Sequence, residues 1–208
     1  MAFDFKKEYK AFYLPPKRPQ LVTVPPARYL AVRGQGNPNQ TGGPYQQALS
    51  LLYAVAYTLK MSQRAGYRME GFFDYVVPPL EGFWQLPDGR WDGDKSQFRW
   101  ISVIRLPEFV QEADLRWARQ QAAAKKGLDC SAVEWLPVDE GLCVQMMHLG
   151  SYDEEPASLA QMESFLAETG YETDLSDRRL HHEIYLSDAR KVPPERRRTV
   201  LRLPIRPL

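Results

Sequence analysis

The segment 181–186 carries the residues best suited to chemistry in this sequence. It reads His-His-Glu-Ile-Tyr-Leu, and on a strand the alternation of side chains places Glu183 and Tyr185 on one face and Ile184 on the other. A carboxylate among aromatic rings is costly to bury without a partner. It can anchor an organic cation stacked on the rings, or have a raised pKa and act as a general base towards water. A strand glutamate satisfied by an arginine or a backbone amide is the structural alternative.

A second segment, 80–86, repeats this combination. As a strand it places Glu81 and Phe83 on one face and Gly82 and Trp84 on the other. The same interpretations apply to Glu81, which either lines a cavity or is neutralised by a neighbouring group.

Aromatic residues are frequent in this sequence, at 12% of 208 residues. They either pack a core or line a pocket for a flat ligand. We interpret Trp117 and Trp135 as core residues. The candidates for pocket walls lie on predicted strands and on a predicted helix: Trp84, Trp100, Tyr45, Tyr53 and Tyr57.

Other kinds of chemistry are not indicated. The loop 34–39 lacks the third glycine of a dinucleotide-binding fingerprint, because Asn39 occupies that position. His181 and His182 point to opposite faces of a strand, so they cannot bind one metal ion together. The two cysteines match no metal, redox or nucleophile motif. We therefore expect neither a metal nor a cofactor.

The composition narrows the class of protein. Lys and Arg number 27 and Asp and Glu 26, so the net charge of +1 argues against a chain that mainly neutralises nucleic acid or an anionic membrane. The basic tail 190–206 is interrupted by Glu195 and by prolines, and it favours a solvated surface or a self-association rim. The absence of an apolar leader and of a membrane-length apolar run, with two cysteines, favours a cytoplasmic protein.

Hydrophobic periodicity and turn residues predict the elements. Residues 1–20 read as an arm lying over the domain, and Pro87-Asp88-Gly89 is a turn. Helices are expected from Pro44 to Leu59, from Pro107 to about Gly127 and from Pro156 to about Glu168, because proline favours the first turn and glycine the end of a helix. The predicted strands are Arg28–Arg33, Tyr67–Val77, Leu80–Leu86, Phe98–Leu106, Leu142–Leu149, His181–Leu186 and Thr199–Ile205.

Two passages of the chain run in the same order. Each has a strand, a glycine, a loop, a proline-led helix, a Gly-Tyr pair and then a glutamate before an aromatic or apolar residue. This pattern predicts an α+β fold of two strand–helix–strand–strand modules, about 21–97 and 130–208, joined by a strand–helix connection at 98–129. Two antiparallel sheets would then face each other across a pseudo-twofold groove, with Glu81 and Glu183 at equivalent positions.

Three longer segments identify a family resemblance. They are Glu81-Gly82-Phe83-Trp84, the run from Trp100 to Pro107, and the run from His181 to Asp188. Together with the opening Phe3-Asp4-Phe5-Lys6-Lys7-Glu8-Tyr9 and the helix from Tyr53 to Lys60, they resemble the GyrI-like small-molecule-binding family over nearly the whole length. Gln85 departs from the pattern, because relatives often carry a second tryptophan at this position.

The resemblance implies a fold, a ligand class and site residues. It implies tandem modules around a central groove that takes lipophilic, often cationic, aromatic molecules. Only about 20 residues precede the first strand, so we expect no DNA-binding domain and a likeness to the stand-alone branch. Some members of that branch resemble hydrolases that open the cyclopropane ring of DNA-alkylating natural products. Glu183 and Tyr185 match their catalytic pair, Trp84 and Trp100 match the groove tryptophans, and Glu154 or Glu155 lies near the groove.

Three hypotheses follow for the function. The first is a binder without turnover, in which Glu183 anchors the ligand. The alternative is a detoxifying hydrolase in which Glu183 polarises a water and Tyr185 orients it or protonates the product. The third is a protein-interaction module that docks a partner through its groove and basic tail. The candidate ligand-binding residues are Trp84, Trp100, Glu81, Phe83, Tyr45, Tyr53, Tyr152 and Glu155.

Overall fold

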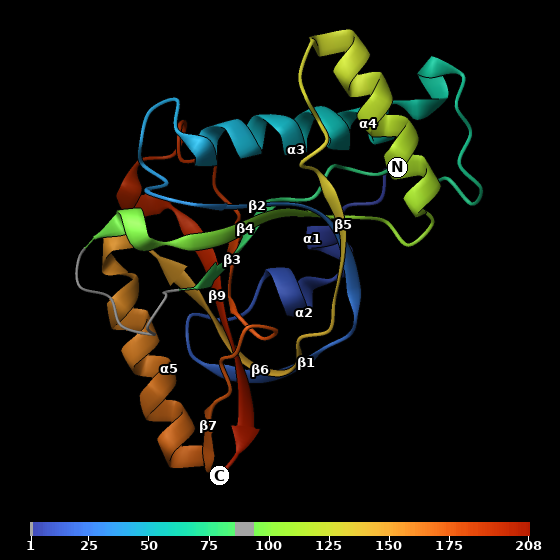
Figure 1. Ribbon diagram of the computed structural model, residues 1–208. Coiled ribbons are helices and arrows are strands. Elements are labelled where there is room, and N and C mark those ends of the chain that lie inside the picture. The colour runs from blue at the N-terminus through green and yellow to red at the C-terminus, as the bar shows by residue number, and fades with distance from the viewer. Residues whose placement is uncertain (1, 86–93) are drawn as a thin grey trace. The chain divides into compact units, whose positions relative to one another are not determined.

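Helices and antiparallel strands alternate along the chain in the computed structural model, which describes residues 2–85 and 94–208 (Figure 1). The fold class is α+β, as predicted. The chain divides into two compact units, each of which gathers segments that are distant in sequence. The first comprises the described residues within Met1–Asp4, Ala27–Pro78 and Gln85–Val138, and the second comprises Phe5–Pro26, Pro79–Trp84 and Asp139–Leu208.

The first unit is built on an antiparallel sheet in the order β4-β2-β5. Helix α3 packs on β2 and β4, and α4 packs on α3. Leu52, Val55 and Leu59 of α3 are fully buried, as the apolar periodicity of this segment predicted. The elements are β2 (Ala27–Gln35), α3 (Pro44–Lys60), η1 (Ser62–Ala65), η2 (Lys95–Gln97), β4 (Arg99–Arg105), α4 (Glu112–Lys126) and β5 (Glu134–Val138).

The second unit holds an antiparallel sheet in the order β1-β6-β9-β8-β3, with β7 paired to β9. Helix α5 packs on β6 and β7, and its Met162 and Leu166 join a core with Val144, Leu201 and Leu203. The elements are α1 (Phe5–Glu8), α2 (Lys10–Tyr13), β1 (Gln20–Val24), β3 (Leu80–Gln85, of which Gln85 falls in the first unit), β6 (Gly141–Leu149), η3 (Tyr152–Glu154), α5 (Glu155–Thr169), β7 (Tyr171–Thr173), β8 (His181–Tyr185), η4 (Pro194–Arg196) and β9 (Arg198–Pro207).

The helix boundaries follow local chemistry, with one correction. Helix α3 begins at Pro44, and α5 ends at Gly170, whose φ of 78° is a left-handed conformation suited to glycine. The helix predicted from Pro107 begins instead at Glu112. The reason is a capping box in which Asp114 accepts a 2.7 Å hydrogen bond from the Gln111 amide.

The strand predicted at Tyr67–Val77 is wrong. The segment contributes an isolated bridge between Tyr75 and Phe3 and otherwise turns. Gly71 has a φ of 70°, which interrupts an extended strand. Its aromatic residues instead pack against other rings of the first unit, including Phe109, which lies 4.9 Å from Phe73 between centroids. Alternation here reflects a cluster of aromatic rings, part of it exposed, and not a sheet.

The predicted modules and the compact units group the chain differently. Strand β3, expected in the first module, pairs with β8 of the second unit through Gly82 and Glu183. The connection at 98–129 belongs to the first unit, where β4 pairs with β2. The pseudo-twofold relation and the groove stay predictions, and Leu86 and the turn Pro87-Asp88-Gly89 lie outside the described residues.

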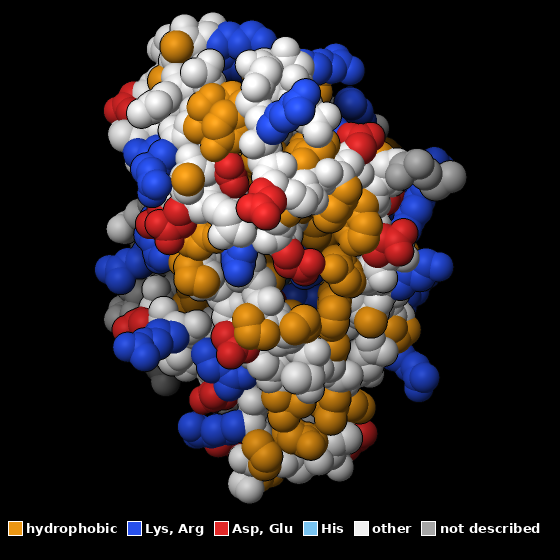
Figure 2. All heavy atoms as spheres, turned by 90° about the vertical axis from the view of Figure 1, so that its right-hand side faces the viewer, with side chains coloured by type: hydrophobic (Ala, Val, Ile, Leu, Met, Phe, Trp, Pro, Cys, Tyr) orange, Lys and Arg blue, Asp and Glu red, His pale blue; other side chains and the backbone are white. Residues whose placement is uncertain are grey.

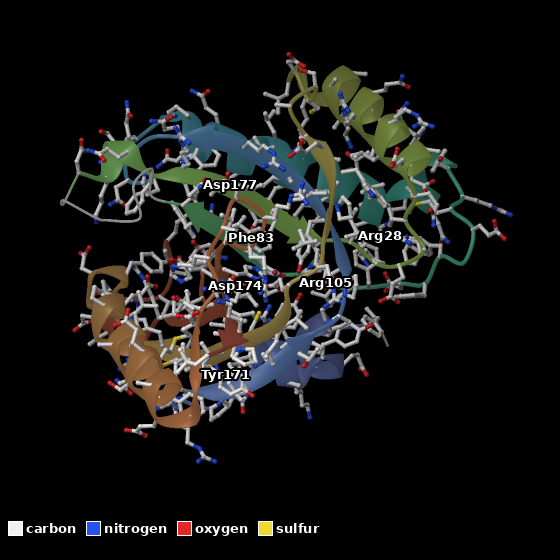
Figure 3. The ribbon with its side chains drawn as sticks, turned by 60° about the horizontal axis from the view of Figure 1, so that its bottom comes forward. Arg28, Phe83, Arg105, Tyr171, Asp174 and Asp177 are labelled. Atoms are coloured by element: carbon white, nitrogen blue, oxygen red, sulfur yellow. The ribbon has the colours of Figure 1, made fainter. Side chains whose placement is uncertain are left out.

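The segment that leads into β8 is held by an ion pair and by hydrogen bonds of Arg179. Asp174, which is labelled in Figure 3, pairs with Arg179. Arg179 also donates to the carbonyl oxygens of Glu140 at 2.9 Å and Leu142 at 2.8 Å. These contacts secure the start of β8, the strand that carries Glu183.

The surface mixes apolar and charged side chains. Figure 2 shows hydrophobic side chains interspersed with acidic and basic ones on the face it presents. Tyr57 and Phe73 are among the exposed apolar residues of the first unit, and Leu175 and Leu208 are among those of the second. Among the described residues, no helix combines the length and apolarity needed to cross a bilayer.

Candidate functional site

Strand β8 sends its side chains to two chemically different faces, as its alternation predicted. Glu183 is paired with Leu201 of β9 and Gly82 of β3. Since Leu201 contributes to the core under α5, Glu183 lies on the α5 face of the sheet. His181 and Tyr185 share that face, and Trp84 joins it through its pairing with His181.

Glu183, Tyr185 and Trp84 form a continuous chain of hydrogen bonds. The Tyr185 hydroxyl donates to Oε2 of Glu183 at 2.7 Å, and the Trp84 indole N–H donates to the Tyr185 oxygen at 2.8 Å. Gly82 lies directly beneath, because a Cβ added there would come within 2.8 Å of Trp84 Nε1 and 3.1 Å of Tyr185 Oη. The absence of a side chain at 82 therefore permits this arrangement.

The start of α5 adds Tyr152 and Glu155 to this face. Tyr152 packs edge-on against Tyr185 with 5.8 Å between ring centroids. The buried His148 of β6 holds this segment, with its ring nitrogens 2.9 Å from Ser158 Oγ and from the Ser151 carbonyl oxygen.

The structure distinguishes the two acidic candidates at this helix start. Glu154 caps the turn by accepting hydrogen bonds from the amide and hydroxyl of Ser151, and these lower its pKa. Glu155 is 8% exposed, and its Oε1 is buried with no hydrogen-bond partner among the described residues. We name Trp84, Tyr152, Glu155, His181, Glu183 and Tyr185 the Glu183 cluster.

The carboxyls of the Glu183 cluster are difficult to ionise. Burial raises the pKa of Glu183 to about 7, although the Tyr185 hydrogen bond and the His182 charge oppose the rise. Burial, followed by repulsion from Glu183 and Asp153, raises the pKa of Glu155 to about 10. Near neutral pH one carboxyl is therefore protonated while the other exchanges its proton, which is the condition for paired acid and base chemistry.

The opposite face of the same sheet holds a buried ion network. Arg202 of β9 donates to Glu140 Oε2 at 2.9 Å and to Gln145 Oε1 at 3.1 and 3.0 Å. His182 lies between two carboxylates, with Nδ1 at 2.9 Å from Glu140 Oε1 and Nε2 at 2.9 Å from Glu81 Oε2.

Helix α2 completes this group. The Tyr13 hydroxyl donates to Glu81 at 2.8 Å, and the Phe12 and Ala11 carbonyl oxygens accept from Arg202 and Gln145 at 2.9 and 2.6 Å. The residues Tyr13, Glu81, Glu140, Gln145, His182 and Arg202, each at most 8% exposed, make up the Arg202 network.

In the Arg202 network, neighbouring charged groups oppose the effect of burial on the pKa values of Glu140 and His182. Burial would raise the pKa of Glu140, but the charges of His182 and Arg202 lower it to about 2. Burial would lower the pKa of His182, but Glu140 first and then Glu81 raise it. The carboxyl groups of Glu81 and Glu140 thus lie against the guanidinium of Arg202 and the ring of His182, so that these buried polar groups have partners.

The expected equivalence of Glu81 and Glu183 is wrong. The register pairs Glu81 with Ile184 and Gly82 with Glu183, so the two carboxylates lie on opposite faces. Phe83 shares the face of Glu81 and stacks on His182 with 4.1 Å between centroids. Neither Glu81 nor Phe83 belongs to the Glu183 cluster, and Glu81 follows the structural alternative, with histidine and tyrosine as its partners.

The remaining candidates lie in the first unit. Trp100 of β4 is 2% exposed and packs edge-on against Tyr45, with 5.1 Å between centroids. Its ring covers Gly34, where an added Cβ would approach within 2.1 Å. Tyr53 stacks on Tyr57, one turn further along α3, at 6.3 Å. Their roles in ligand binding stay predictions.

Sequence reasoning missed the Arg202 network as a unit. Its members come from α2, β3, β6, β8, β9 and the turn at Glu140, and Glu140 and Arg202 are 62 residues apart. A signal was present, since Arg202 is the one charged residue within the otherwise apolar run 200–205. Within the described ranges no group of three His, Cys, Asp or Glu side chains is arranged to hold a metal ion.

A family model for the GyrI-like small-molecule-binding domain matches residues 17–206. The chain belongs to the GyrI-like small-molecule-binding family. A crystal structure of an uncharacterized conserved protein from Listeria innocua is 45% identical to it, with a TM-score of 0.93 over 98% of this chain and 100% of that one. No match is found among curated proteins.

Other solved structures extend the comparison. Two structures described as hydrolases from Listeria innocua are each 44% identical to this chain. They have TM-scores of 0.89 and 0.91, over 98% and 99% of it and 100% of their own length. The C-terminal domain of EcmrR shares the fold at 10% identity, with a TM-score of 0.55 over 92% of this chain and 98% of that domain.

Proposed function

We propose that this GyrI-like protein is a hydrolase that binds lipophilic or cationic aromatic molecules at the Glu183 cluster and opens strained, cyclopropane-type rings with water. The observation that carries the proposal is the geometry of the buried carboxyls Glu183 and Glu155. Oε2 of Glu183 accepts a 2.7 Å hydrogen bond from Tyr185, and Oε1 of Glu155 is buried with no hydrogen-bond partner among the described residues. Burial raises the pKa values of the two groups to about 7 and about 10. Two titratable groups with pKa values set apart by their surroundings supply a base and an acid at one pH. The similarity to hydrolases of Listeria innocua is consistent with this assignment.

The proposed reaction assigns a task to each group. The water oxygen forms a bond to a cyclopropane carbon as the strained carbon–carbon bond breaks. In a spirocyclopropyl cyclohexadienone, the released electron pair moves into the dienone, whose oxygen becomes that of a phenol. Ionised Glu183 takes the proton of the water, and protonated Glu155 supplies the phenol proton. The proton on Glu183 then returns to Glu155 through solvent, and the product differs from the substrate by one water.

Tyr185 and the aromatic rings serve positioning. The hydroxyl of Tyr185 holds Oε2 of Glu183 and leaves Oε1 to receive the proton. Trp84 fixes Tyr185 in turn. A base placed in this way contributes about 10²–10⁴ to the rate, which is enough for a ring that is already reactive.

The test uses a spirocyclopropyl cyclohexadienone and follows the addition of one water by mass spectrometry. Wild type and Glu163→Gln, an exposed carboxylate of α5, should turn the probe over equally. Glu183→Gln should lose about 10²–10⁴-fold in kcat while it retains affinity for the probe. Turnover that survives Glu183→Gln would refute the role of the base.

A second candidate is a receptor without turnover, which the description of the family as small-molecule-binding favours. The same carboxyl pair and rings would then anchor an aromatic cation. Quenching of tryptophan fluorescence by the probe, with no product from wild type, would support this candidate over the hydrolase.

A further inference from the structure

Several buried polar atoms on the α5 face have no hydrogen-bond partner among the described residues. They are Glu155 Oε1, His181 Nε2 and Thr199 Oγ1. Thr199 is paired with Tyr185 in the sheet register and therefore shares its face. Burying such atoms without a partner destabilises a protein, so their accumulation on the face of Glu183 indicates a site that serves a reactant.

His181 has the most informative geometry of these residues. Its Nε2 lies 3.9 Å from Oε1 of Glu183, while Oε2 of the same carboxylate accepts the Tyr185 hydrogen bond. The separation is too long for a good direct hydrogen bond, but one water placed about 2.8 Å from both atoms spans it. The position touches the carboxylate oxygen that Tyr185 leaves unoccupied.

The charge state of His181 suits the binding of a water between its Nε2 and Oε1 of Glu183. Burial, together with the charge of the adjacent His182, lowers the pKa of His181 to about 4. The imidazole is therefore neutral near pH 7, and in the tautomer with its proton on Nδ1 it presents a lone pair at Nε2. Nε2 of His181 can therefore accept a hydrogen bond from water. Because the neutral ring carries no positive charge, it does not lower the pKa of Glu183 and so does not weaken Glu183 as a base.

We propose that His181 is a further catalytic residue of this site, whose Nε2 and the Oε1 of Glu183 together hold the attacking water. The inference rests on the proposed hydrolase function. One hydrogen of the water is directed to Glu183, which removes it, and the other to His181, which retains it by a hydrogen bond. The lone pair of the water oxygen is thereby turned towards the ring carbon.

The kinetic test compares His181→Phe with His181→Gln on the same spirocyclopropyl probe. Phenylalanine retains the packing of a ring but removes the nitrogen, and it should lower kcat by about 10²-fold, with KM within about twofold. Glutamine reaches a similar position with a polar atom and should restore at least about a tenth of the wild-type kcat. A His181→Phe enzyme with wild-type kcat, or with its loss entirely in KM, would overturn the proposal.

A structural test separates this inference from the hydrolase proposal. High-resolution crystals of wild type should show a water bonded to both His181 Nε2 and Glu183 Oε1, and crystals of His181→Phe should lack it. A position without water in wild type overturns the role of His181 even if the enzyme turns over. A water there in a protein without turnover supports the water site and refutes the hydrolase function instead.

Discussion

Glu81 and Glu183 are neighbours on paired strands, yet their surroundings differ completely. Glu81 is 1% exposed and lies against His182 and the hydroxyl of Tyr13 on one face of the sheet. Glu183 lies on the other face, where burial raises its pKa and Tyr185 is its hydrogen-bond donor. A buried carboxylate serves structure where opposite charges match it, and it becomes reactive where they do not.

The comparison extends to whole groups of residues. The Arg202 network matches each carboxylate with a cation, whereas the Glu183 cluster gathers two carboxyls with a neutral histidine. Removing a charge from the Arg202 network should therefore destabilise the protein. Replacing Glu183 by a neutral residue should stabilise it, because opposite charges do not fully offset the burial of that carboxylate.

The largest expected effect is on the Arg202 network. Arg202→Met leaves the buried carboxylates without their guanidinium and should reduce the free energy of unfolding by about 3–5 kcal/mol. Arg206→Met is the matched control on the same strand, where the arginine is 60% exposed and the substitution should leave the free energy of unfolding nearly unchanged. Urea unfolding measures both. Equal stability of the two variants would contradict a structural network.

The next largest effect is an increase in the free energy of unfolding, expected for a substitution at Glu183. A carboxyl whose pKa is raised in the folded state destabilises the protein as the pH rises from its ordinary value of 4.5 through about 7. Glu183→Gln should therefore raise the free energy of unfolding near pH 8 by up to about 3 kcal/mol, and change it little near pH 4.

Glu140 provides the contrast in the same pH series. Its pKa is lowered from 4.5 to about 2, so its stabilising contribution is present above about pH 4.5 and is lost as the pH falls towards 2. Denaturant midpoints of wild type and Glu183→Gln at several pH values measure both effects. A Glu183→Gln variant less stable than wild type near pH 8 would contradict the assignment of an unbalanced site.

A smaller effect is expected in the pH profile of turnover. The wild-type kcat/KM should rise with pH through about 7 as Glu183 becomes ionised. Tyr185→Phe removes a hydrogen bond that lowers the pKa of Glu183, so the rise should move to higher pH by up to about one unit, equivalent to about 1.4 kcal/mol. An unchanged profile would show that Tyr185 does not act through Glu183.

The smallest predicted change is at Gly82. In Gly82→Ala the new methyl group would displace Trp84 and Tyr185 and weaken their hydrogen bond, at a cost of about 1 kcal/mol. Titration of the probe by tryptophan fluorescence should show an affinity reduced about fivefold, with the melting temperature lowered by about 2–4 °C. Wild-type affinity would mean that the Trp84–Tyr185 bond does not shape the site.

Much of the Glu183 cluster was predictable from the chain. Alternation in 181–186 placed Glu183 with Tyr185, and alternation in 80–86 separated Glu81 from Trp84, as the register confirms. The choice between Glu154 and Glu155 was left open, although a local signal was present. Ser151 and Glu154 have the Ser-x-x-Glu spacing of a capping box, in which Glu154 accepts from the Ser151 amide. The burial of Glu155 depends on the tertiary structure.

Short sequence patterns were sufficient to predict the fold class, most helix boundaries, the faces of β3 and β8 and the family. Each of these depends on residues that lie a few positions apart in the chain. The pKa of a carboxyl depends instead on the charges, dipoles and solvent around it in space. For Glu140 and Glu183 these surroundings come from β8 and β9, so folding decided that Glu140 lies between His182 and Arg202 and that Glu183 is buried beside Tyr185.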